Sequence, residues 1–96
     1  MRRNKSAIAR HILVKSRGEA EAIKKQLSSG KAFEQLAKKF STCPSKKQGG
    51  NLGEFRQGEM VPAFDKVVFK AALHQVHGPI KTQFGFHLIE ILYRDD

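Results

Sequence analysis

The sequence predicts an α+β fold, in which helices pack against a sheet of β-strands. Side chains over residues 7–15 and 86–93 follow the period of two that is typical of strands. Between these segments, apolar residues recur at helical spacing, and Gly- or Pro-containing stretches separate one element from the next. Helix-rich connections between strands indicate a mixed α+β sheet with helices on it. With 96 residues, the chain has the size of one domain.

The N-terminal strand, residues 7–15, is apolar on both faces, as a central strand would be. A helix is predicted directly after it, because Ser16 as N-cap and Glu19 three residues later match a capping box. Gly30 is a natural C′ residue and predicts the end of this helix. The expected buried positions of the helix are Ala20, Ile23 and Leu27.

The clearest helical pattern in the chain predicts a second helix over residues 31–41. Its apolar residues recur at i, i+3, i+4 and i+7, namely Phe33, Leu36, Ala37 and Phe40. The polar segment that follows, up to Gly53, is expected to be a loop with room for one short helical turn.

The second half of the chain predicts shorter elements. Residues 52–55 form a short strand and residues 56–59 a turn. Pro62 is suited to the first position of a helix, whose expected buried residues are Phe64, Val67, Val68 and Ala71. Gly78-Pro79-Ile80 predicts a brief edge strand, because proline cannot donate to a central ladder. With the last strand, 86–93, the order is strand, two or three helices, strand, helix and two strands.

Positive charge is concentrated in the first half of the chain. The formal net charge is +9, and residues 1–48 have a balance of +10 against −1 for residues 49–96. A basic face favours encounter with anionic partners, so weak binding of nucleic acid or acidic proteins stays open beside a purely solvating role. Few aromatic side chains accompany these charges, which argues against a base-stacking surface. Residues 1–6 are expected to be a disordered basic tail, and residues 7–96 the domain.

Several classes of protein are disfavoured by composition. No apolar run approaches the ~18 residues of a membrane span. The apolar stretch after the basic N-terminal residues is short and interrupted, which argues against a secretory signal. Cys43 is the single cysteine, so no intrachain disulfide can form. We therefore expect a cytoplasmic monomer that contacts no membrane.

Three residues could carry chemistry together. His11 and His87 belong to the two best-defined strands, and Cys43 lies in the polar loop. If those strands are neighbours in the sheet, the two imidazoles can face each other near the thiol. Each histidine alone is more often a hydrogen-bonded core residue than a catalyst. Three groups that converge would instead perturb one another's protonation.

The residues alone leave three kinds of site open. A metal site would use the two histidines and the cysteine, but no closely spaced ligand pair exists, so neither metal nor cofactor is expected. A thiol hydrolase would use Cys43 as nucleophile with a histidine base, although no oxyanion hole is evident and Pro44 lacks a backbone donor. The third is a polar lining to an apolar pocket built from Met60 and Phe64, with Leu52 and Phe84 as further walls.

Four separated motifs in this sequence resemble those of the parvulins, a family of peptidyl-prolyl cis/trans isomerases. The resemblance covers residues 8–94 and is closest to the small single-domain bacterial cytoplasmic members. The motifs are His11-Ile12-Leu13-Val14-Lys15, Ser41-Thr42-Cys43-Pro44-Ser45 running to Gly49-Gly50-Asn51-Leu52-Gly53-Glu54-Phe55, Gly58-Glu59-Met60-Val61-Pro62-Ala63-Phe64, and Thr82-Gln83-Phe84-Gly85-Phe86-His87-Leu88-Ile89.

The resemblance implies a parvulin-like fold: a four-stranded antiparallel sheet surrounded by about four helices, in the order β-α-α-α-β-α-β-β. The two long terminal strands would lie side by side at its centre. Four residues would form the catalytic network, namely His11, Cys43, Thr82 and His87. By the same resemblance, the proline ring would bind a pocket of Leu52, Met60 and Phe64, with Phe84 at its rim.

The implied activity is that of a rotamase in protein folding, which accelerates rotation about X-Pro bonds without a covalent intermediate. Its partners would be flexible or unfolded polypeptides that contain proline. Phosphate-directed eukaryotic relatives carry a WW domain and a basic loop after the first strand. Here only Lys15 and Arg17 lie nearby, so an apolar residue before proline is expected to be preferred over phosphoserine or phosphothreonine. The alternatives are a catalytically weak, chaperone-like binding module and a nucleic-acid-associated basic protein.

Overall fold

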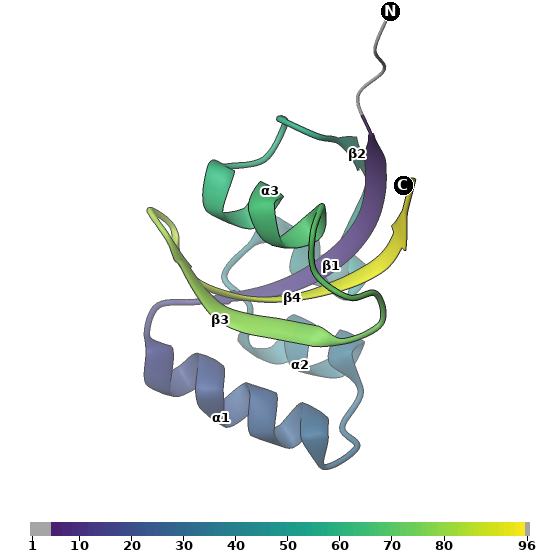
Figure 1. Cartoon of the computed structure of the whole chain (residues 1–96). Helices are drawn as coiled ribbons and strands as arrows, with labels where there is room; N and C mark the ends of the chain where they lie inside the picture. The colour runs from purple at the N-terminus through teal and green to yellow at the C-terminus, as the bar shows by residue number, and fades with distance from the viewer. Residues whose placement is uncertain (1–4, 96) are drawn as a thin grey trace, which may run out of the picture.

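The computed structural model describes residues 5–95 (Figure 1). Strand β1 opens the fold, and strands β3 and β4 close it. Along the chain the elements are β1 (Ser6–Val14), α1 (Arg17–Ser28), α2 (Phe33–Phe40), the 3₁₀ helix η1 (Pro44–Gln48), β2 (Asn51–Arg56), α3 (Pro62–Val68), β3 (Val76–Thr82) and β4 (Gly85–Arg94). None of the helices between residues 5 and 95 is long and apolar enough to cross a membrane.

The four strands form one antiparallel sheet in the order β2-β1-β4-β3. The two long terminal strands are therefore neighbours at its centre, as predicted. Helix α3 covers one face of the sheet, and α1 and α2 cover the other (Figure 1). The predicted fold class and element order are confirmed, with η1 as the third, 3₁₀, helix of the first connection.

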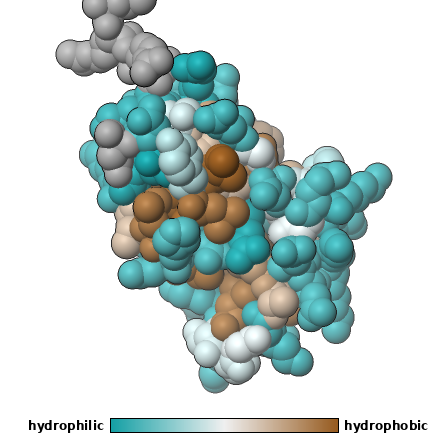
Figure 2. All heavy atoms as spheres, turned by 90° about the vertical axis from the view of Figure 1, so that its right-hand side faces the viewer, coloured by the Kyte–Doolittle hydropathy of each residue, from teal (hydrophilic) through white to brown (hydrophobic). Residues whose placement is uncertain are grey.

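Each face of the sheet has its own apolar core. The core on the α3 face, here called the pocket-side core, consists of Ala7, Ala9, Phe55, Phe64, Val68, Phe69, Ile89 and Ile91. The core on the other face, the helix-side core, consists of Ile12, Val14, Ala20, Ile23, Phe33, Leu36, Ala37 and Leu88. β1 and β4 contribute to both cores, which explains why β1 is apolar on both faces. Outside, hydrophilic side chains surround a central apolar patch on the face seen in Figure 2.

Helix α1 begins and ends as its sequence predicts. The Ser16 hydroxyl accepts a hydrogen bond from the Glu19 amide at 3.2 Å, as in a capping box. Past the C-terminus, Gly30 adopts a φ of 103° and donates to Leu27 O, while Lys31 donates to Gln26 O. These two bonds form a Schellman motif, which requires the left-handed conformation that glycine adopts readily.

Several element boundaries differ from the prediction. Residues 1–4 of the expected disordered tail lie outside the described residues, whereas Ser6 is already part of β1 and pairs with Arg56. Helix α2 is shorter than predicted, and strands β2 and β3 are longer. Helix α3 ends at Val68, so Ala71 lies beyond it, although it still packs, partly buried, against the pocket-side core that Phe69 also joins.

Arg10 is a charged residue on the apolar helix-side face of β1. Its Nε and Nη2 atoms contact Glu90 Oε1 on β4 at 2.7 and 2.6 Å, and its guanidinium lies 4.7 Å from the centre of the Phe33 ring. The paired carboxylate and the aromatic ring satisfy the charge where it is partly buried. The pair also links the two central strands beside the residues that form the site.

Gly50 holds the loop after η1 against β1. Its carbonyl accepts a hydrogen bond from His11 N at 3.0 Å, and its own φ is 88°. A Cβ atom at this position would lie 2.4 Å from the carbonyl oxygen of His11. Only glycine therefore permits both the backbone conformation and the close approach.

We predict that Gly50→Ala lowers the free energy of unfolding by about 2 kcal/mol or more, from the left-handed conformation and the contact together. Urea denaturation measures the change. Gly18→Ala is the matched control, because Gly18 lies within α1 with open space around its Cβ position. That variant should be as stable as the parent or up to about 1 kcal/mol more stable. Equal stabilities for the two variants would contradict the prediction.

Candidate active site

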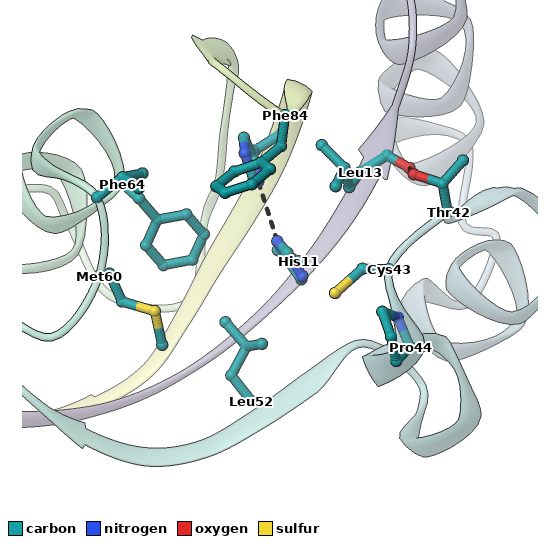
Figure 3. Close-up of a pocket in the computed structure, with 11 residues that line it drawn as sticks. His11, Leu13, Thr42, Cys43, Pro44, Leu52, Met60, Phe64 and Phe84 are labelled. Carbon is teal, nitrogen blue, oxygen red and sulfur yellow. Dashed lines mark hydrogen bonds between the residues drawn. The ribbon is translucent and has the colours of Figure 1, made fainter.

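A pocket of about 440 Å³ lies on the α3 face of the sheet (Figure 3). Strands β1 and β4 form its floor, α3 and the segment before it form one wall, and the start of η1 forms another. The turn between β3 and β4 stands over it. Its lining residues are His11, Leu13, Thr42, Cys43, Pro44, Leu52, Met60, Val61, Phe64, Phe84 and His87.

The apolar side of the pocket is a socket formed by Met60, Phe64 and Leu52. Phe64 is buried, whereas Met60 and Leu52 are half-buried and pack against the pocket-side core. In Figure 3, Met60 and Phe64 lie on one side of the His11 ring, and Cys43 and Pro44 on the other. Phe84 is 59% exposed at the rim. An apolar ligand of a few carbon atoms can therefore enter against Phe64 while its ends stay outside.

The loop that carries Met60 is held by side chains that cap its backbone. Gly58 N donates to Asp65 Oδ1 of α3 at 3.0 Å, and Arg56 N donates to Glu59 Oε1 at 2.8 Å. Pro62 begins α3 as predicted. These bonds fix the entry to the helix, so Met60, two residues before α3, and Phe64, within α3, are held on the same side of the pocket.

The two histidines form a hydrogen-bonded dyad on the floor. Their Nδ1 atoms are 3.0 Å apart, and Nε2 of His87 lies 2.7 Å from the Thr82 hydroxyl. Both histidines are buried. The rings of His11 and His87 lie nearly at right angles to the Phe64 ring, with centroid distances of 5.5 and 5.4 Å respectively. Thr82 also accepts a hydrogen bond from the Phe84 amide at 3.2 Å. The network thus runs from His11 to the turn at the rim.

The dyad is electrically neutral at physiological pH. Burial, and in second place the charge of His87, lowers the pKa of His11 from 6.5 to about 4. Burial lowers the pKa of His87 to about 4 as well. The geometry agrees, because one Nδ1 must donate while the other accepts, and fully protonated rings would set two N–H groups against each other. His11 Nε2 is buried and has no hydrogen-bond partner among residues 5–95.

Cys43 is a half-buried free thiol at the N-cap position of η1. Its side chain points toward the His11 ring across the pocket (Figure 3). The two histidines and this thiol are the titratable groups that line the pocket, and no Asp or Glu is among them. Within residues 5–95, no group of three His, Cys, Asp or Glu side chains is placed to hold a metal ion.

The structure brings the sequence-predicted residues together. Seven of the eight line the pocket, and the eighth, Thr82, lies behind the dyad as the partner of His87. Sequence reasoning missed Leu13, Thr42, Pro44 and Val61 as lining residues. Leu13 lies two residues after His11 on the same face of β1, and the other three are next to predicted site residues in the sequence. Strand alternation and sequence adjacency could therefore have identified these four residues.

Comparison with known proteins places this geometry in a family. Residues 10–92 match the rotamase family described as the PPIC-type PPIASE domain. Foldase protein PrsA of Bacillus subtilis is 45% identical over 83 residues, which are 85% of this chain and 28% of that protein. Chaperone SurA of Legionella pneumophila is 44% identical over 95 residues, with 88% of this chain and 22% of that protein covered. The chain spans less than a third of the length of these curated relatives.

Solved structures agree. The solution structure of NmPin, the parvulin of Nitrosopumilus maritimus, has a TM-score of 0.83 and 41% identity, and the match covers 97% of this chain and all of that one. Crystalline PrsA from Bacillus anthracis, a peptidylprolyl isomerase, has a TM-score of 0.92 and 38% identity, with 97% of this chain and 43% of that one covered. The expected fold and family are thereby confirmed: this chain belongs to the parvulins, the PPIC-type family of peptidyl-prolyl cis/trans isomerases.

Proposed function

We propose that the pocket binds the proline ring of X-Pro segments in flexible polypeptides and that the domain accelerates rotation about the preceding bond without a covalent intermediate. The observation that carries this proposal is the juxtaposition of an apolar socket, Met60 and Phe64, with a neutral histidine dyad. The relatives named foldase and chaperone support polypeptides as the ligands.

The reaction needs a modest amount of stabilisation. The X-Pro bond rotates over tens to hundreds of seconds unaided, behind a barrier of ~20 kcal/mol that arises from amide resonance. Turnover of ~10³ per second requires that roughly 7 kcal/mol of this barrier be removed. Since no bond forms or breaks, the protein has to favour the twisted amide over both planar forms.

An apolar socket can provide this preference. It fixes the ring while the preceding carbonyl swings, so orientation is gained before rotation starts. The twisted amide has a less polar carbonyl than the planar one. A pocket whose lining is mostly apolar disfavours the planar dipole more than the twisted state.

The thiol of Cys43 lies on the side of the pocket opposite Met60 and Phe64, with His11 between them (Figure 3). Cys43 points into the pocket toward the His11 ring (Figure 3). We assign it the role of a weak hydrogen-bonding partner of the carbonyl that precedes proline. The His11–His87 dyad supports this wall from beneath, with Thr82 fixing His87. Because both histidines have a low pKa, the dyad is uncharged and cannot act as a cationic acid. We therefore expect it to polarise the substrate amide rather than to transfer a proton to it.

The arrangement of cations favours an apolar residue before proline. Arg17 lies 5.2 Å from the centre of the Phe86 ring. Phe86 packs against the helix-side core, on the sheet face opposite the pocket. This contact with Phe86 holds Arg17 away from the bound peptide. Lys15 is then the remaining positively charged residue of the β1–α1 connection. A phosphate on the residue before proline would lack the paired guanidinium groups that bind such anions well.

The chaperone-like alternative uses the same pocket and differs in turnover. The complete set of pocket residues favours an active enzyme over a binding module alone. Binding of nucleic acid or acidic proteins through the basic half stays a prediction, as do a monomeric state and a cytoplasmic location. The basic residues of α1 and α2 lie on the sheet face away from the pocket, so binding through these helices would leave the pocket open, whereas Lys46 and Lys47 belong to η1 beside the pocket.

We predict that an Ala-Leu-Pro-Phe peptide is isomerised at least about tenfold faster than its phosphoserine-proline counterpart, since a desolvated phosphate without paired cations costs more than 1.4 kcal/mol. An NMR exchange assay measures both rates on one sample. Faster turnover of the phosphopeptide would overturn the assigned preference. No turnover of either peptide would overturn the assigned activity.

Substitution of the thiol distinguishes non-covalent from covalent catalysis. We predict that Cys43→Ala and Cys43→Ser each lower kcat/KM by about tenfold and leave clear activity, because one weak polar contact contributes about 1.4 kcal/mol. A protease-coupled assay measures the loss. Complete loss of activity in both folded variants would show that the thiol is a required nucleophile.

The low pKa of each histidine makes stability dependent on pH. The unfolded chain binds more protons than the folded one between about pH 4 and 6.5, so stability is complete above 6.5 and is lost as the pH falls through this range. Between pH 7 and 5 we predict a loss of about 2–4 kcal/mol in unfolding free energy from the dyad. Urea denaturation at both values measures it.

Two variants isolate the contribution of the dyad to this pH dependence. His11→Asn removes one of the buried groups, so about half of the loss should disappear. His74→Asn is the control, because His74 is exposed and its φ of 61° suits asparagine; its loss should equal that of the parent. A His11→Asn chain with an unchanged pH dependence would contradict the prediction.

A further inference from the structure

Strand β1 continues past the end of its neighbour β2. The β1–β2 pairing reaches Arg10 opposite Asn51, and the Gly50 carbonyl then accepts from His11 N. Beyond this point the backbone of Leu13 has no strand on that side. Its amide donates instead to the Ser41 hydroxyl at 3.0 Å, and its carbonyl accepts from Thr42 N at 2.8 Å. The segment that begins at Ser41 therefore replaces a strand for one residue of β1.

The Ser41 hydroxyl makes a second contact that reaches the active site. It accepts a hydrogen bond from Cys43 N at 3.3 Å, so one oxygen binds the amide of β1 and the amide of the thiol-bearing residue. The side chain is buried, with 3% of the residue exposed. A buried hydroxyl with two backbone donors is a fixed link, because each donor would otherwise lose its partner.

Helix termination does not account for this hydroxyl. Ser41 is the C-cap of α2, but the cap bond is made by its backbone amide, which donates to Ala37 O at 3.0 Å. The side chain turns instead to β1 and Cys43. Alanine would cap α2 equally well through the same amide, so the hydroxyl has a function apart from the helix.

The link determines where the thiol lies. Cys43 makes no side-chain cap bond to η1, and the following Pro44 has no amide hydrogen to anchor the chain. The Cys43 amide is thus held by Ser41, while its carbonyl accepts from Lys46 N at 3.0 Å. In this position the thiol faces the His11 ring (Figure 3), whose Nε2 is buried and has no hydrogen-bond partner within the described part of the chain.

We infer that Ser41 is a positioning residue of the active site: its hydroxyl ties Cys43 to β1 and so sets the thiol against the histidine dyad. The inference rests on the proposed function where it concerns catalysis. Where it concerns the placement of the thiol, it stands on the two hydrogen bonds alone.

The first test follows the thiol without any isomerase assay. In Ser41→Ala the Cys43 amide loses its acceptor, while the bonds of Thr42 to Leu13 and of Lys46 N to the Cys43 carbonyl remain. The thiol is then held less firmly, and the rate of alkylation by iodoacetamide should rise by about threefold or more across pH 7–9. Ser41→Thr keeps the oxygen and should restore a rate close to that of the parent. Ile23→Val weakens the helix-side core without touching Cys43 and should leave the rate unchanged. An unchanged rate in Ser41→Ala, or an equal rise in Ile23→Val, would overturn the inference.

The second test measures coupling. Ser41→Ala should lower kcat/KM by about threefold to tenfold in the parent and by less than about twofold in a Cys43→Ala background, because the effect passes through the thiol. The same factor in both backgrounds would show that Ser41 acts on the fold as a whole and would overturn the inference.

If Ser41→Ala alone does not fold, both tests are made in the Gly18→Ala background. Absence of turnover in the parent chain would defeat the proposed function, and the alkylation test would still decide the placement.

Discussion

The antiparallel pairing of β1 with β4 at the centre of the sheet is the constraint on which the site depends. It brings together two residues that are 76 positions apart in the chain, with Leu13 opposite His87 and His11 opposite Ile89. Because both histidines have the parity of the pocket-side face, this register makes them diagonal neighbours and allows the Nδ1 atoms to meet at 3.0 Å. A shift of one residue would turn one imidazole to the helix-side core and remove the dyad.

Burial then decides what the dyad can do. Phe64 packs against both rings. It thereby contributes to the burial that is the main cause of the low pKa of each histidine. The same phenylalanine is a wall of the ring socket. The same side chain therefore contributes both to the apolar socket and to the burial that keeps the polar floor uncharged, so affinity for a proline ring and the electrostatics of the reaction share one packing contact.

Much of this arrangement could be read from the sequence, and the limits have physical causes. The capping box at Ser16, the glycine at position 30 and the apolar repeat of α2 are local signals, and each predicts its element. The lengths of β2 and β3 depend on pairing with distant strands, which no local pattern encodes. The motifs of the resembled family identify the pocket residues. The role of Ser41 depends on the end of β2 relative to β1, so it becomes visible only when the strands are in place.

The site combines rigid and open parts in a way that suits a reaction without bond breaking. Its floor is tied at several points, by Gly50 to His11, by Ser41 to Leu13 and Cys43, and by Thr82 to His87. Its rim is open, with Phe84 largely exposed and Thr42 and Pro44 at the surface. A polypeptide can therefore present a proline to fixed groups while its flanking residues stay in solvent. Because the ring is held and the preceding carbonyl moves, rigidity is needed beneath the ring and around the thiol, and freedom is needed where the chain enters and leaves.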